Sequence, residues 1–379
     1  MIQRFWPWLV LILLLGANLT ALLIPYGGNP SALLHTDELM QSLHPLPPGI
    51  AVLQIPAYDG AQYYQVARFL PLVFDPDRWP ILASFSTPGP NAYQRFLLPL
   101  TAWIITLGHD QWLPIAFLLI NVASIVATFW MVLRWRKNAL PAFALALCPA
   151  ALIGLHFSLA EPLTIALITA FLIRCVGSGK VTMIDVFLLC LIGIAREINL
   201  LFLIGMFAIA LWRQQWKDAI LLSIPLITFA LLQFLIYGIF GSVPLFLSTA
   251  KHALPLQAIG EILLGHKGYG IFTLSSIALF LLFVLPATAA AARSLIKDRR
   301  DPVTILLAGF LLVMLLMPDI IWGSITSIGR VITPVYPLFV AHDALHQSAL
   351  TRAVLVAMLL LGLGSAAGLA GIVHPFVLS

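Results

Sequence analysis

Charged residues are scarce in this chain. They make up 9% of its 379 residues, whereas a soluble domain carries about 25%. Because 61% of the residues are hydrophobic, a soluble globule could not cover its surface with polar groups, and that class is excluded. A lipid solvent removes the difficulty, provided that every backbone polar group is bonded within helices or a closed barrel. The apolar runs are continuous, roughly 15 to 23 residues long, and do not alternate as barrel strands do.

Cysteines and recognisable cofactor motifs are also few. The three cysteines, Cys148, Cys175 and Cys190, lie in apolar segments at unrelated spacings, which argues against disulfides or a metal framework. The nine histidines are scattered, so no metal-ligating residues are predicted. Phosphate-binding loops, dinucleotide fingerprints, HExxH and GxSxG are all absent. No basic cluster is interleaved with aromatic residues, and no nucleic-acid partner is expected.

The apolar runs predict an all-α polytopic membrane protein. We expect residues 1–379 to form a single integral membrane domain, with the first run as an uncleaved span. About eleven spans are predicted. They lie near 6–24, 112–133, 139–156, 159–174, 181–195, 197–212, 218–240, 269–291, 302–318, 328–345 and 352–371. The pairs 139–174 and 181–212 are predicted to be hairpins with polar tips.

Basic residues orient the chain. With the N-terminus inside, 13 of the 20 Lys and Arg residues fall on the inner side, as the positive-inside rule requires. We therefore expect a cytoplasmic N-terminus and any active site on the periplasmic or extracellular side. The short loops favour a bacterial inner membrane.

Two segments lie outside the spans. The loop 25–94 is rich in Pro, Tyr, Asp and His, and a long loop in a compact protein is typically functional. Residues 95–108 are apolar but only about 21 Å long as a helix, so we expect an interfacial or re-entrant helix beside that loop. The alternative, in which 95–108 spans the membrane, would move the basic clusters to the outer side.

Asp59 leads the candidate residues of the first loop. On a helix that starts near Asp59, Tyr63 lies one turn later on the same face. Asp59 could simply cap that helix, or it could be a carboxylate that acts as a general base at the membrane surface.

Ionisable residues at the two hairpin tips are the next candidates. Glu161 lies at the first tip, and Arg196 and Glu197 lie at the second. Charges at this depth are costly, so they face a cavity or one another. They could form a structural ion pair, or Arg196 could hold an anionic group that Glu197 orients.

Arg330 is predicted to open a span from the outer side, where its charge opposes the helix dipole and needs a negative partner. Its planar fork suits a phosphate, although a snorkelling arginine is the alternative. In the second outer loop, Lys251 and His252 could help to hold a phosphate or sugar, or be ordinary loop charges.

Four motifs follow one another along the chain: YDGAQYYQVAR at 58–68, NAYQRFLLPLTAWIITLG at 91–108, LAEPLTIAL at 159–167 and AREINLL at 195–201. In this order they resemble the GT-C superfamily of membrane glycosyltransferases, in particular a bacterial branch similar to GPI mannosyltransferases and other cell-surface glycopolymer proteins. The motifs cover about 55–215, and the architecture covers the whole chain.

The resemblance implies a polyprenyl-phosphate sugar donor and an essential acidic residue in the first outer loop. Asp59 is similar to that carboxylate, and Asp37 and Glu38 compete with it. We expect Arg330, Arg196 and Lys251 to bind the donor phosphate. Residues that would contact substrate or support the site are Tyr63, Tyr64, Arg95, Glu161, Glu197 and His252.

The predicted function is therefore inverting transfer of a sugar to a glycan or glycolipid acceptor, of the hexosyl- or mannosyltransferase type. No cofactor is required, and a divalent metal, magnesium or manganese, is compatible with the reaction. The alternatives are a transporter or flippase for a lipid or lipid-linked sugar, and a non-catalytic membrane subunit of a glycopolymer assembly system.

Overall fold

The computed structural model is helical throughout the part of the chain that it describes. Described are residues 2–373 except 55, 86–87, 179, 243–259, 261–270, 318 and 323. No strand occurs in these ranges; an isolated bridge joins Asp37 and Leu53. The three cysteines are free, as their spacing predicts.

Five helices of the described ranges are long and apolar enough to cross a membrane. They are α1 (Ile2–Leu23), α8 (Leu113–Arg136), α14 (Trp216–Phe240), the pair α16 (Ile271–Leu279) and α17 (Leu285–Lys297) joined by a π-helical turn, and α22 (Ala349–Val373). A sixth is added if a bent pair counts as one span. The chain is thus an all-helical protein with the composition of an integral membrane protein, and the predicted count of about eleven spans stays a prediction.

Two predicted spans are broken. The segment 139–156 divides into α9 (Ala139–Ala146) and α10 (Pro149–His156), which meet at 41°. Pro149 begins α10 because proline lacks the N–H that a continuous helix would need there. The segment 328–345 divides into α20 (Ile325–Val331) and α21 (Val335–Leu345).

Shorter apolar helices form the predicted hairpins. α11 (Glu161–Ser178) follows α10, and the pair α12 (Met183–Ala195) and α13 (Asn199–Trp212) encloses a three-residue turn. α18 (Pro302–Leu315) and a single turn, α19 (Asp319–Trp322), precede α20. The hairpin turns place Glu161, Arg196 and Glu197 at helix ends, as the sequence predicts.

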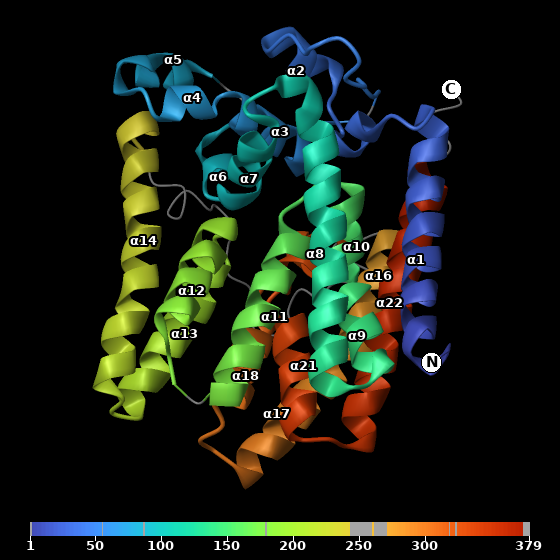
Figure 1. Cartoon of the computed structure of the whole chain (residues 1–379), viewed down its shortest axis with the longest axis vertical. Coiled ribbons are helices and arrows are strands. Elements are labelled where there is room, and N and C mark those ends of the chain that lie inside the picture. The colour runs from blue at the N-terminus through green and yellow to red at the C-terminus, as the bar shows by residue number, and fades with distance from the viewer. Residues whose placement is uncertain are drawn as a thin grey trace.

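The first long loop and the segment 95–108 fold into short helices that lie across one end of the long ones (Figure 1). We call this the short-helix layer. It contains α2 (Glu38–Leu43), α3 (Asp59–Arg68), α4 (Leu70–Val73), α5 (Trp79–Ser84), α6 (Pro90–Tyr93) and α7 (Leu97–Thr106). α7 has ten residues, about 15 Å, too few to cross a hydrocarbon core of about 30 Å.

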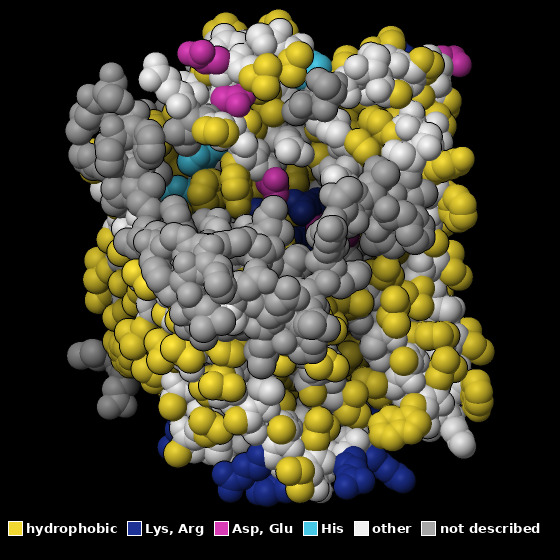
Figure 2. All heavy atoms as spheres, turned by 180° about the vertical axis from the view of Figure 1, so that it is seen from behind, with side chains coloured by type: hydrophobic (Ala, Val, Ile, Leu, Met, Phe, Trp, Pro, Cys, Tyr) yellow, Lys and Arg dark blue, Asp and Glu magenta, His cyan; other side chains and the backbone are white. Residues whose placement is uncertain are grey.

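The opposite end of the molecule is basic. The last turn of α8 carries Arg134 and Arg136, and the last turn of α17 carries Lys297. Figure 2 shows Lys and Arg side chains gathered at this lower end and acidic side chains toward the upper end. We call it the basic end. The fold therefore separates the basic clusters from the short-helix layer.

Packing between the layer and the long helices leaves little room at α3. A Cβ on Gly60 would lie 2.1 Å from the backbone oxygen of Phe157, just after α10. Only glycine permits this approach. A second small cluster, which includes Val66 and Leu70, packs the layer against Leu232 and Ile236 of α14. These contacts fix α3, and with it Asp59, over the hairpin tips.

Candidate active site

Asp59 is held by two arginines. It is the first residue of α3, and its side chain makes no cap, so the helix-cap interpretation is wrong. Asp59 Oδ2 instead accepts hydrogen bonds from Arg95 Nη1 at 2.5 Å and from Arg330 Nη2 at 2.8 Å. These partners come from the segment before α7 and from α20, and no local pattern connects them with α3.

Arg95 bridges Asp59 and Glu197. Its Nε and Nη2 donate to the two oxygens of Glu197 at 2.9 and 2.8 Å, a bidentate geometry that fixes the plane of the guanidinium. Its Nη1 also donates to the Tyr63 hydroxyl at 3.2 Å. Tyr63 thus lies on the same face of α3 as Asp59, as their spacing predicts. Arg95, predicted to have a supporting role, is central to the site.

Arg330 reaches three partners from the last turn of α20. Nε donates to Glu161 at 2.6 Å, Nη1 to the Tyr58 hydroxyl at 2.9 Å, and Nη2 to Asp59. The prediction that Arg330 opens a helix is wrong: the break before α21 places it at a C-terminal turn, where the dipole favours a positive charge. The expected negative partners are present for a different reason, because a buried guanidinium needs them.

Glu161 and Arg196 form the deepest pair. Arg196 Nη1 lies 2.9 Å from Glu161 Oε1 and donates to the backbone oxygen of Arg330 at 2.7 Å. A structural ion pair, one of the two interpretations of the hairpin-tip charges, is therefore present between Arg196 and Glu161, and Glu197 pairs with Arg95. Sequence neighbours in a helix-to-helix turn point in different directions, and each finds its partner on another element.

Together these residues make an arginine–carboxylate cluster: Asp59, Arg95, Glu161, Arg196, Glu197 and Arg330. Its three positive charges balance its three negative charges. Glu161 is fully buried, whereas the side chains of Asp59 and Glu197 remain 29% and 26% exposed. The cluster is therefore accessible on the side of α3 and closed on the side of α11.

Electrostatics keep Asp59 ionised. Burial raises the pKa of Asp59, but the charges and hydrogen bonds of Arg95 and Arg330 outweigh burial, and the pKa falls well below the ordinary range. Burial disfavours the charged form of Arg95 too, which lowers its pKa. Glu197 and the other anionic groups nearby outweigh burial and raise the pKa of Arg95 well above its usual value. In this arrangement Asp59 is a firmly charged hydrogen-bond acceptor and a weak base.

Two buried polar atoms of the cluster have no hydrogen-bond partner in the described part of the chain. They are Glu161 Oε2 and Arg196 Nε. Buried donors and acceptors are normally paired, so these two can take a further polar ligand.

The other predicted loop residues lie elsewhere. Asp37 caps α2 by accepting from Met40 N at 2.8 Å, and its second oxygen accepts from Ala57 N at 2.9 Å. Glu38 follows it on the exposed side of α2. Neither residue contacts the cluster, although Asp37 holds the segment that leads into α3.

Tyr64 points away from the cluster. The guanidinium of Arg68 lies 5.7 Å from its ring centroid, and burial raises the pKa of Tyr64. Lys251 and His252 lie outside the described residues. Tyr58, whose hydroxyl contacts Arg330, is the site residue that sequence reasoning missed; it directly precedes Asp59 in the quoted motif, but only the folded chain shows its contact.

Nothing in the cluster resembles a cation site, because each carboxylate is already neutralised by an arginine. One group in the described ranges has the spacing of metal ligands, and it lies at the basic end: Asp301, His342 and His346. The scattered spacing of the histidines in the sequence does not predict this group.

Comparisons of the chain with protein-family models, curated proteins and solved structures give no match.

Proposed function

We propose that this chain is a multi-pass membrane glycosyltransferase. It moves a sugar from a polyprenyl-phosphate donor to a glycan or glycolipid acceptor at the end of the molecule covered by the short-helix layer. The proposal includes about eleven spans, a cytoplasmic basic end, and a site on the periplasmic face of a bacterial inner membrane. The GT-C-like motifs and the arginine–carboxylate cluster support it.

One observation carries the proposal: Arg95 and Arg330 converge on a single oxygen of the partly exposed Asp59. Two guanidinium groups that share one carboxylate oxygen can donate the same hydrogen bonds to a phosphate oxygen. Each arginine also has a second carboxylate partner: Glu197 for Arg95 and Glu161 for Arg330. That second partner would keep the guanidinium in place when a phosphate replaces Asp59.

An anionic donor would then exchange places with Asp59. The phosphate accepts from Arg95 and Arg330, and Asp59 loses the two charges that lower its pKa. Its burial, which raises the pKa, then dominates and makes the carboxylate a better base. Donor binding would thus activate Asp59 only when the sugar is in place.

The chemical step is a direct displacement. An acceptor hydroxyl oxygen attacks the anomeric carbon while the bond from that carbon to the phosphate oxygen breaks. The polyprenyl phosphate leaves with the bonding electrons, and the two arginines stabilise its increased negative charge. Asp59 takes the hydroxyl proton, and the anomeric configuration inverts.

The charge balance of the cluster favours a second candidate, a non-catalytic membrane subunit. The three arginines neutralise the three carboxylates, so a purely structural role would also account for the cluster: it would join the short-helix layer to the hairpin tips. In that case Asp59 matters for stability and not for turnover. A transporter for a lipid-linked sugar would use the arginines for binding without a chemical step.

The test is transfer from a panel of radiolabelled polyprenyl-phosphate sugars by the purified protein in lipid, with Asp59→Asn as the variant. Asparagine keeps the size and one acceptor oxygen but cannot take the proton. We expect transfer in the wild type, and in the variant a loss of about 100-fold or more with donor binding retained. Equal transfer by both proteins would overturn the role of Asp59. Saturable donor binding without turnover in either protein would favour the transporter, and neither binding nor turnover would favour the subunit.

A further inference from the structure

Asp301 is the anchor of a polar cluster at the basic end. It caps α18 by accepting from Val303 N at 3.3 Å and Thr304 N at 3.1 Å. The Thr304 hydroxyl also donates to the same carboxylate. Only 8% of Asp301 is exposed, and no arginine or lysine pairs with its charge in the described ranges. This isolation distinguishes Asp301 from the carboxylates at the opposite end.

Two histidines approach Asp301 from the end of α21. His342 and His346 are one helical turn apart, so they share a face, and their ring centroids lie 4.8 Å apart. His346 Nε2 is 3.2 Å from Asp301 Oδ2. His342 Nδ1 is 3.0 Å from the Thr304 hydroxyl that contacts the same carboxylate. One donor atom from each of the three residues lies within 4.8 Å of the others.

We propose that Asp301, His342 and His346 bind a divalent transition-metal ion, and zinc is the metal that best fits these ligands. Two imidazoles and one carboxylate are an established donor set for zinc, with water as the fourth ligand. Donor atoms around a tetrahedral ion at about 2.1 Å stand about 3.4 Å apart. The Asp301–His346 pair is already near that spacing, and the donor atom of His342, which lies within 4.8 Å of the other two, would move closer to them on binding.

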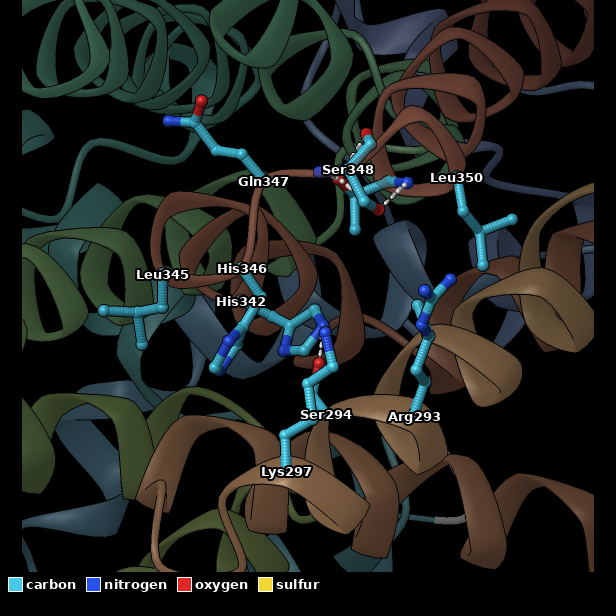
Figure 3. Close-up of a pocket in the computed structure, with 11 residues that line it drawn as sticks. Arg293, Ser294, Lys297, His342, Leu345, His346, Gln347, Ser348 and Leu350 are labelled. Carbon is cyan, nitrogen blue, oxygen red and sulfur yellow. Dashed lines mark hydrogen bonds between the residues drawn. The ribbon is translucent and has the colours of Figure 1, made fainter.

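Ser294 completes the arrangement. Its hydroxyl lies 3.4 Å from His342 Nε2 (Figure 3). When Nδ1 binds the ion, Nε2 carries the proton and can donate to Ser294, which fixes the ring as the outer partners of metal-bound histidines do. Without the ion, the serine hydroxyl can donate to Nε2 instead. The same side chains therefore satisfy both states of His342.

A cavity gives the site access to solvent. It measures about 360 Å³, and His342, His346 and Ser294 line it (Figure 3). There is room for the water that fills the fourth position. Arg293 and Lys297 line the same cavity, and their positive charges weaken the attraction for a cation.

The ion would join the beginning of α18 to the end of α21. α21 follows α20 after a short break, and α20 carries Arg330, so the ion would fasten the basic end of the segment that bears this arginine. This site does not depend on the proposed function.

The test uses the full chain, purified without a histidine tag, stripped with a chelator and reconstituted in lipid. Cobalt is titrated as a spectroscopic probe, and zinc then competes with it. Two variants remove ligands: Asp301→Asn, because asparagine also caps helices, and His346→Gln, because His346 is at the cavity. His109→Gln is the matched control, since this exposed histidine precedes α8 at the opposite end.

We expect one cobalt ion per chain with a tetrahedral spectrum, displaced by zinc. Each ligand variant should raise the dissociation constant at least tenfold, while His109→Gln leaves it unchanged. Circular dichroism shows whether each variant keeps its helices. A wild-type protein that binds no cobalt, or that keeps its affinity in both ligand variants, overturns the site; so does an octahedral, water-like spectrum.

Discussion

Two polar clusters, the arginine–carboxylate cluster and the group around Asp301, lie at opposite ends of the helices. They differ in the partners that compensate their buried carboxylates. In the arginine–carboxylate cluster, every acid meets an arginine from another element, and the pairs Arg95–Glu197 and Arg330–Glu161 join residues more than 100 positions apart. At the basic end, Asp301 contacts His346 directly and is linked through the Thr304 hydroxyl to His342, one helical turn earlier. An arginine cannot lose its proton, whereas a neutral histidine can bind a metal. The first cluster suits an anionic ligand, and the second suits a cation.

The basic end also provides an internal control, the buried pair of Arg136 and Asp343. These side chains lie 2.8 Å apart with exposures of 10% and 4%. Arg330 and Glu161 are similarly buried at 2.6 Å. Both are buried pairs of an arginine and a carboxylate. They differ because Arg330 also contacts the partly exposed Asp59, whereas Arg136 does not.

The largest expected effect comes from Arg330→Ala. It leaves the fully buried Glu161 with one arginine fewer and should lower the free energy of unfolding by about 3–5 kcal/mol. Sugar transfer should fall by about 100-fold or more, because the leaving phosphate loses a guanidinium that donates hydrogen bonds to it. Arg136→Ala should cost similar stability and leave transfer per folded molecule unchanged. Equal losses of transfer would show that both pairs act only through stability; thermal unfolding and transfer in lipid are the measurements.

A smaller effect is expected from Gly60→Ala, which tests how the short-helix layer docks. The added methyl would meet the backbone oxygen of Phe157, and α3 would have to shift away from the hairpin tips. We expect transfer to fall at least tenfold with the helix content retained, because displacement of about 1 Å is enough to impair catalysis. Gly89→Ala is the control, since its Cβ would have no neighbour within 4 Å. A fully active Gly60→Ala protein would show that Asp59 need not stay where the layer places it.

The smallest expected effect concerns how the contribution of Asp59 to the stability of the fold changes with pH. The folded pKa of Asp59 lies well below the unfolded value of about 3.9, because the two arginines outweigh burial. Asp59 therefore stabilises the fold above the unfolded pKa and loses this contribution as the pH falls through the folded pKa. The difference in unfolding temperature between wild type and Asp59→Asn should be constant from about pH 5 to 8 and shrink below about pH 4. A difference that changes near neutral pH would contradict the double arginine contact.

Sequence reasoning found the residues of the arginine–carboxylate cluster more readily than their pairing. Helical spacing is local, so it predicts Asp59 and Tyr63 on one face, and the structure confirms this. The apolar pattern continues across the break at 332–334, so it predicts the wrong helix end for Arg330. The hairpin-tip charges predict an ion pair without naming its members, and only the folded chain shows that Arg196 pairs with Glu161 and Glu197 with Arg95.

The sequence by itself determined the helical membrane class, the segregation of basic residues and the polar hairpin tips, because composition and periodicity respond to the solvent that surrounds each segment. Only the tertiary structure decided that Arg95 and Arg330 share Asp59, that Glu161 lies beneath them, and that Asp301 meets His342 and His346. Those contacts depend on how the short-helix layer docks and where α20 and α21 break. Both are set by packing between distant segments, such as the close approach at Gly60, which no local pattern encodes.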